Sequence, residues 1–229
     1  MPLPVVATPT YDLKLPVSEK KIKFRPFLVK EEKILLIASE SKNQSEILNS
    51  LRTVVTNCVE DDLNIDELPL VDVEYLFLQL RARSVGEVVE LIRELKSGEK
   101  VKLKVDLTSI GIKKKRVKSD IKLNEKIGIK LKAPTFSVSK VTGEDETEKL
   151  FDILTECIES IYDENGVYSS KDYTKSELKQ FLESLTQSQF KMLTDYFEAL
   201  PKLYHEVVYE DPKTNKKEKV VFDNIYDFF

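Results

Sequence analysis

The chain has few of the side chains on which metal sites depend. Cys58 and Cys157 are the only cysteines, and His205 is the only histidine among the 229 residues. One histidine and two distant cysteines cannot supply a usual structural zinc set, which takes four Cys or His ligands. Each cysteine lies in an apolar helical pattern, so we expect two buried free thiols and no disulfide. No metal site is predicted.

Glycine is also scarce, and the common catalytic motifs are missing. The six glycines are scattered singly, and none belongs to a G-x-G-x-x-G or G-x-x-x-x-G-K phosphate loop. No G-x-S-x-G motif marks a hydrolase nucleophile. His205 stands beside Glu206, but adjacent side chains of a strand point to opposite faces. We therefore expect no cofactor, no catalytic residue and no enzyme.

Long apolar runs and an excess of positive charge are absent too. No stretch of about eighteen consecutive apolar residues occurs, which argues against a membrane-spanning helix. The opening MPLPVVATPTYDLKL has neither the charged region nor the continuous apolar region of a signal peptide. A net charge of −4 argues against a protein that coats nucleic acid non-specifically. We expect a soluble protein of a cytoplasm, with no membrane partner.

What the chain does contain is a mixture of helical and strand periodicity that predicts an α+β fold. An N-terminal β-hairpin and helices are followed by a central β region. A mostly helical C-terminal half then ends in a β-hairpin. The polar segment TGEDET at 142–147 is the best candidate for a linker. It predicts an N-terminal α+β domain at 1–141 and a mainly helical domain at 142–229.

The predicted elements have these bounds. Strands are expected at Tyr11–Leu15, Lys21–Phe27, Val88–Leu95, Val101–Leu107, Thr135–Val141, His205–Glu210 and Lys217–Phe222. Helices are expected at Lys30–Ala38, Asn43–Val59, Glu146–Tyr162, Lys175–Leu185 and Gln187–Leu200. Capping boxes at Thr174 with Glu177 and at Thr186 with Gln189 begin the last two helices. The two hairpins that begin with EVV are similar, which leaves a true duplication open.

The segment 67–87, ELPLVDVEYLFLQLRARSVGE, predicts a helix with two apolar faces. At about 100° per residue, Val71, Tyr75 and Leu78 gather on one side. The opposite side carries a second apolar set, Val73, Leu76, Phe77 and Leu80. Polar stripes that include Arg81 and Arg83 separate the two faces. Two hypotheses follow: a central helix inside its own domain, or a helix with one face left for a partner.

The C-terminal residues are strongly aromatic. Leaving Tyr226, Phe228 and Phe229 in water would be unfavourable, although chain ends usually fray. Docking on their own domain is the favoured interpretation, and docking into another protein is the alternative. Together with residues of the two-faced helix they form the predicted partner-binding set: Val71, Tyr75, Leu78, Arg81, Arg83, Tyr226, Phe228 and Phe229.

A lysine-rich tract runs over Lys113–Lys132 and includes KKKRVK. Such a tract could grip phosphates in a strongly salt-dependent way. Its alternating apolar residues instead predict the solvated face of a sheet, and it lacks aromatic residues that could stack on bases. We favour a solvated face or contact with an acidic protein surface. A nucleic-acid-binding accessory protein that uses this tract is the alternative function.

Five segments, in chain order, carry a family resemblance. They are TYDLKLP…KIKFRPFLVKEEKILL at 10–36, LPLVDVEYLFLQLRARSVGEVVEL at 68–91, FDILTECIESIYDE at 151–164, DYTKSELKQFLESLTQSQF at 172–190 and PKLYHEVVYEDPKTNKKEKVVFDNIYDFF at 201–229. Together they resemble the baseplate protein family of contractile-tailed, T-even-type bacteriophages. Some relatives carry cysteine pairs near the hairpin tips, suggestive of zinc. This chain has Lys96–Lys100 and Asp211–Asn215 there, without cysteine, so no metal is carried over.

The resemblance implies a non-enzymatic late viral protein. Its expected role is that of a baseplate hub component, or of a chaperone for hub assembly, acting by protein–protein contacts. The implied partners are other phage tail and baseplate hub proteins, and self-association is left open. The implied locations are the host cytoplasm during assembly and, if the protein stays in the particle, the tail baseplate of the virion.

Overall fold

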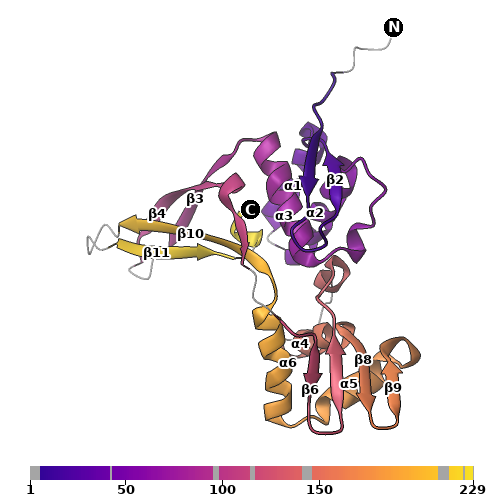
Figure 1. The fold of residues 1–229 in the computed structure, drawn as a ribbon. Helices are drawn as coiled ribbons and strands as arrows, with labels where there is room; N and C mark the ends of the chain where they lie inside the picture. Colours follow the sequence, from indigo (N-terminus) through magenta and orange to yellow (C-terminus); the bar gives the residue numbers. More distant parts are fainter. Residues whose placement is uncertain are drawn as a thin grey trace. The chain divides into compact units, whose positions relative to one another are not determined.

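A computed structural model describes residues 6–41, 43–94, 98–113, 117–140, 146–210, 217–223 and 225–228. The fold is α+β, with helices and several small antiparallel sheets (Figure 1). The chain divides into two compact units: Met1–Lys113 with Lys202–Phe229 form the first, and Lys114–Pro201 form the second. Within the described ranges, every helix is too short or too polar to cross a lipid bilayer.

The N-terminal hairpin forms as the alternating pattern predicts. β1 (Tyr11–Lys14) pairs antiparallel with β2 (Lys21–Phe24). On β2 the residues Ile22 and Phe24 are buried, whereas Lys21 and Lys23 are exposed. A bridge from Phe24 to Val59 ties the hairpin to the end of the second helix. The apolar side of this hairpin therefore belongs to the core of the first unit.

Two helices follow the hairpin and lie against each other. They are α1 (Val29–Ser41) and α2 (Gln44–Cys58). α2 begins where the sequence predicts, because the side chain of Asn43 accepts hydrogen bonds from the first-turn amides of Ser45 and Glu46. Both Cys58 and Cys157 are buried free thiols, as expected.

The two-faced helix is α3 (Leu70–Ser84), and it lies in the interior of the first unit. It follows the short 3-10 helix η1 (Ile65–Glu67) and packs against α2, the 3-10 helix η2 (Leu107–Ser109) and strand β10. Its buried residues include members of both predicted apolar faces: Val71, Val73, Leu76, Phe77, Leu78 and Leu80. The burial supports the hypothesis of a central helix.

Two antiparallel hairpins complete the first unit. One joins β3 (Val88–Glu94) to β4 (Lys100–Asp106), and the other joins β10 (Lys202–Glu210) to β11 (Lys217–Phe222). The hairpins run side by side, with β4 beside β10 (Figure 1). β5 (Gly111–Lys113) pairs with the start of β10, so the sheet order is β11-β10-β5. The final 3-10 helix η5 spans Ile225–Phe228.

The second unit is a four-stranded antiparallel sheet with helices. Its strands, in the order β6-β7-β8-β9, are β6 (Asp120–Lys122), β7 (Gly128–Leu131), β8 (Ile158–Asp163) and β9 (Gly166–Ser169). Its helices are η3 (Phe136–Lys140), α4 (Glu146–Glu156), η4 (Ser170–Asp172), α5 (Lys175–Glu183) and α6 (Gln187–Ala199). Both predicted capping boxes are present at the starts of α5 and α6.

One core cluster holds the second unit together. It joins apolar residues of the sheet to those of α4, α5 and α6: Leu123, Ile129, Leu131, Leu154, Ile158, Leu178, Leu182, Leu193 and Tyr196. The strands contribute alternate residues and the helices contribute residues three or four apart. Each strand and each helix therefore buries the one face on which its apolar residues recur.

The predicted helix Glu146–Tyr162 is wrong in its second half. α4 ends at Glu156, and Ile158–Asp163 is the strand β8, which pairs with β7 and β9. A short apolar run is compatible with either state by periodicity alone. The β-branched Ile158 and Ile161 favour the strand once partner strands lie on both sides. Similarly, the strand expected at Thr135–Val141 is wrong for Phe136–Lys140, which is 3-10 helix; Val141 lies outside the described residues.

The two compact units differ from the predicted domains at 1–141 and 142–229. The C-terminal hairpin belongs to the first unit, because Lys202–Tyr204 pair with Gly111–Lys113. The second unit is therefore inserted into the first along the sequence. Of the linker predicted at 142–147, residues 142–145 lie outside the described part of the chain.

Candidate functional site

The structure separates the predicted partner-binding residues of α3 by burial. Val71 is buried and Leu78 is 0% exposed, so both belong to the core of the first unit. Tyr75 and Arg81 are half-buried, whereas Arg83 is exposed. The Arg83 guanidinium pairs with Glu87 at 3.0 Å and lies 5.1 Å from the ring centre of Tyr11. Partner binding through this set stays a prediction, and Arg83 is its most accessible member on α3.

Asp72 fixes the turn of the N-terminal hairpin to the start of α3. Its two carboxylate oxygens accept hydrogen bonds from the backbone N–H groups of Val17 at 2.8 Å and Ser18 at 2.7 Å. The carboxylate also lies in the first turn of α3, where the helix dipole favours negative charge. Asp72 is fully buried and Val17 and Ser18 are half-buried, so water has limited access to these bonds.

Replacing Asp72 by alanine is expected to loosen this turn. Two half-buried N–H donors would lose a charged acceptor, which costs about 1–3 kcal/mol of unfolding free energy. Amide hydrogen exchange at Val17 and Ser18 should become faster than in the native chain. Asp62→Ala removes an exposed carboxylate and serves as the control. If the amides of Val17 and Ser18 exchange as slowly in Asp72→Ala as in Asp62→Ala, Asp72 does not anchor the turn.

Two charged side chains of α3, those of Glu74 and Arg81, have polar atoms that find no hydrogen-bond partner in the part of the chain that the structure describes. Within the described residues no hydrogen bond reaches the Glu74 carboxyl, and the Nε of Arg81 is buried without one. Loss of hydration raises the pKa of Glu74 to about 8 and lowers the pKa of Arg81 from its ordinary value. Glu74 is therefore largely protonated at neutral pH.

Glu74 makes stability depend on pH. Its pKa is higher in the folded protein than the ordinary 4.5, so the folded state binds the extra proton between about pH 4.5 and pH 8. Unfolding free energy should fall as pH rises through that window. Glu74→Gln should remove this fall and gain about 2–4 kcal/mol over the native chain at pH 9. Urea unfolding at several pH values measures this change, and Glu40→Gln, which alters an exposed carboxylate, is the control. If the native and Glu74→Gln proteins show the same dependence of unfolding free energy on pH, the role of Glu74 is contradicted.

The terminal aromatic residues are described only in part. Phe228 is 0% exposed, and its ring centre lies 5.8 Å from that of Phe222 on β11. Phe228 thus docks on its own unit. The side chain of Tyr226 and the whole of Phe229 lie outside the described part of the chain.

The described lysines of the basic tract are partly paired with acidic residues of the same unit. Lys126 lies 3.2 Å from Glu164, and Lys130 lies 2.7 Å from Glu159 on β8. Residues 114–116 of the tract lie outside the described residues. Part of the positive charge is thus already matched within the second unit.

His205 and Glu206 make separate contacts, as their positions on a strand predict. The His205 Nδ1 lies 3.4 Å from the Ser109 hydroxyl. Glu206 instead accepts a hydrogen bond from the hydroxyl of Tyr204 at 3.1 Å and pairs with Lys219 at 2.7 Å. Among the residues that the structure describes, no group of three or more His, Cys, Asp or Glu side chains is placed to hold a metal ion.

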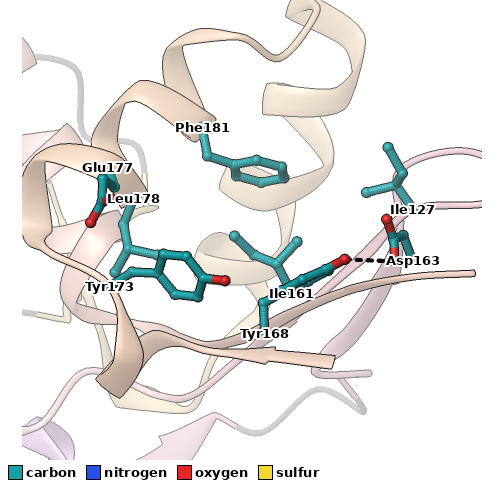
Figure 2. A pocket seen from close by; sticks show the side chains of 8 residues that line it. All are labelled: Ile127, Ile161, Asp163, Tyr168, Tyr173, Glu177, Leu178 and Phe181. Carbon is teal, nitrogen blue, oxygen red and sulfur yellow. Dashed lines mark hydrogen bonds between the residues drawn. The ribbon is translucent and has the colours of Figure 1, made fainter. Parts of the chain in front are cut away.

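The second unit contains a pocket of about 330 Å³ beside α5 (Figure 2). Its walls come from the β6–β7 loop, β8, β9, the segment after η4, and α5. The lining residues are Ile127, Ile161, Asp163, Tyr168, Tyr173, Glu177, Leu178 and Phe181. Aromatic and aliphatic side chains form most of the surface, and no basic side chain is among them.

Three aromatic rings border the pocket. Tyr168 and Tyr173 meet edge to face with ring centres 6.4 Å apart. Phe181 reaches from α5 across from these two rings, as Figure 2 shows. Tyr173 is 42% exposed, so the rings remain accessible to a bound group.

Two carboxylates stand at opposite ends of the pocket in Figure 2. Asp163 accepts hydrogen bonds from the backbone N–H of Asn165 at 2.8 Å and from the Tyr168 hydroxyl at 3.1 Å. Glu177 accepts one from the backbone N–H of Thr174 at 2.8 Å. These backbone bonds are the leading cause that lowers the pKa of each carboxyl. Both are ionised at neutral pH.

The pocket can hold a side chain, and the sequence alone does not predict it. The residues from 163 to 174 were assigned to no element, because β8 was predicted as helix. The available signals were the turn residues Asp163–Gly166 and the capping box at Thr174. Only the pairing of β8 with β9 brings Tyr168 next to α5.

Comparison with known protein families gives one match. A family model described as T4 bacteriophage base plate protein matches residues 8–229, which is essentially the whole chain. Comparisons with curated proteins and with solved structures found no match. The resemblance drawn from the five sequence segments is confirmed. The chain belongs to the T4 bacteriophage base plate protein family.

Proposed function

We propose that this chain is a non-enzymatic phage tail protein. It serves as a component of the baseplate hub, or as a chaperone for hub assembly, and acts through protein–protein contacts. The observation that carries the proposal is the family match over residues 8–229. The partners would be other tail and hub proteins, met in the host cytoplasm during assembly and, for a hub component, retained in the tail baseplate.

Accessible apolar residues of the first unit support a role in binding other proteins. On α1 the side chains of Val29, Leu36 and Ile37 are exposed, although the helix buries Leu35 and Ala38 on its other side. On β3 the side chains of Val88 and Ile92 are exposed as well. Clusters of exposed apolar side chains are typical of interaction surfaces.

The test is recovery of partners from infected cells. The tagged full chain, produced during infection by its own phage, should enrich tail and hub proteins in mass spectrometry relative to an unrelated tagged phage protein. Absence of such proteins from the recovered set would contradict the proposal. Quantification in purified virions then separates the two roles, because a hub component stays in the particle and an assembly chaperone leaves it.

A gel-shift salt titration tests the alternative of a nucleic-acid-binding protein. Phosphate contacts by several lysines would give tight binding that weakens steeply with salt. We expect no such binding, because the tract lacks aromatic residues that could stack on bases and part of its charge is matched by Glu164 and Glu159. Tight and steeply salt-dependent binding would contradict the assembly proposal.

A further inference from the structure

We propose that the pocket beside α5 captures an arginine side chain from a partner protein. The proposal rests on the assembly function above and specifies the chemistry of one contact. It follows from three properties of the pocket: its aromatic walls, its ionised carboxylates and an adjoining acidic hollow.

The walls suit a planar cation with an apolar stem. Guanidinium groups stack on the faces of aromatic rings, and Tyr168, Tyr173 and Phe181 provide three rings around one space. The methylene groups of arginine can cover Ile161 and Leu178. A volume of about 330 Å³ accommodates one large side chain together with the backbone next to it.

The carboxylates argue against a purely apolar occupant. Glu177 accepts both of its hydrogen bonds from Thr174 at Oε2, and no hydrogen bond reaches its Oε1 within the described residues. An apolar group that closed the pocket would remove water from this ionised group without replacing its hydrogen bonds, which is unfavourable. A guanidinium supplies donors and the opposite charge at once.

The neighbouring surface continues the negative charge. A second hollow shares Ile127 and Asp163 with the pocket and is also lined by Asn124, Glu125, Lys126 and Glu164. Its one base, Lys126, is already paired with Glu164 at 3.2 Å. Carboxylates therefore outnumber bases along the combined surface, which favours a positively charged segment.

The test is a titration of the full chain with three hexapeptides followed by NMR. Each is acetylated and amidated, with the sequence Ala-Ala-X-Leu-Ala-Ala, where X is arginine, citrulline or leucine. The arginine peptide should shift the resonances of Tyr168, Tyr173 and Phe181 and bind about fivefold more tightly than the uncharged citrulline peptide. The proposal would be overturned if the arginine and citrulline peptides bound equally tightly or if the leucine peptide bound more tightly than the arginine peptide. It would also be overturned if only resonances of residues outside the pocket shifted.

A matched pair of variants tests the carboxylate. Glu177→Gln keeps the capping box, because a glutamine already plays that part at Gln189 on α6. It should weaken the arginine peptide about threefold to tenfold and leave the citrulline peptide unchanged. Glu183→Gln removes one charge from the same helix outside the pocket and should change neither. Equal effects of the two variants would count against a contact with Glu177.

The test of the arginine site can fail independently of the test of the assembly function. Recovery of tail proteins by the native chain, without any perturbation of the pocket by the arginine peptide, would overturn the arginine site alone. Failure to recover tail proteins would overturn the assembly function on which the site rests.

Discussion

Replacing Glu31 by alanine is expected to lower the unfolding free energy of the first unit by about 3–5 kcal/mol. The Glu31 side chain is 0% exposed and lies 3.1 Å from the Arg25 guanidinium. Its other oxygen accepts a hydrogen bond from the Leu28 N–H at 2.8 Å, at the start of α1. Without Glu31, the Arg25 guanidinium, 17% exposed, would keep its charge and lose its carboxylate partner.

Arg25 connects this ion pair to other segments of the first unit. Its guanidinium also donates to the backbone carbonyls of Pro26 at 3.0 Å and Asn57 at 2.9 Å. The pair thus joins the segment after β2, the first turn of α1 and the end of α2. Burial raises the pKa of the Glu31 carboxyl, but the hydrogen bonds from Arg25 and from the Leu28 N–H, together with the nearby positive charges, bring it below its ordinary value.

Urea unfolding followed by circular dichroism measures the loss. Glu32→Ala, at the next position of the same helix, is the matched control and should change stability by less than about 0.5 kcal/mol. Equal losses in the two variants would contradict a special role for the buried pair. The double variant Arg25→Met with Glu31→Ala should recover part of the loss, because no unpaired charge remains.

Replacing Leu78 by alanine is the second substitution with a large expected effect. Leu78 is 0% exposed on α3, and its truncation should cost about 2–5 kcal/mol through lost burial and the cavity left behind. If Leu78 met a partner instead, the variant would keep its stability and lose partner binding. The structure therefore predicts a lower thermal midpoint for the isolated chain.

A leucine of α1 provides the control for Leu78. Leu36 is 58% exposed, so Leu36→Ala should leave the unfolding free energy nearly unchanged. Mass spectrometry after pull-down then shows whether Leu36→Ala weakens partner recovery while the fold is intact. Equal thermal midpoints for the two variants would contradict the assignment of Leu78 to the core.

Local sequence signals predicted many of the individual elements. The capping boxes at Thr174 and Thr186 begin α5 and α6, because each signal acts within one turn of helix. The error at Ile158–Asp163 has the opposite cause. Its strand state depends on pairing with β7 and β9, and a helical reading of the same apolar run was equally compatible with the spacing.

For the candidate sites, too, local patterns are visible in the sequence and contacts between separate elements are not. The sequence showed that α3 has two apolar faces, but only the packing of α2, η2 and β10 around it shows where those faces go. It gave no indication that Arg25 meets Glu31 or that Asp72 holds the turn at Val17. Each of these contacts joins groups whose pairing depends on how separate elements pack.

By itself, the sequence determined the α+β class, the family, and the sandwiched character of α3, because composition, segment order and helical period are properties of the chain. Tertiary structure decided the rest. The pairing of β10 with β5 returns the C-terminal hairpin to the first unit, and the pairing of β8 with β9 forms the pocket with α5. β8 and β9 form a local hairpin, but its place against α5 depends on packing. The pairing of β10 with β5 joins segments far apart in the sequence, and such contacts are set by the free energy of burial over the whole fold, which no local pattern of residues encodes.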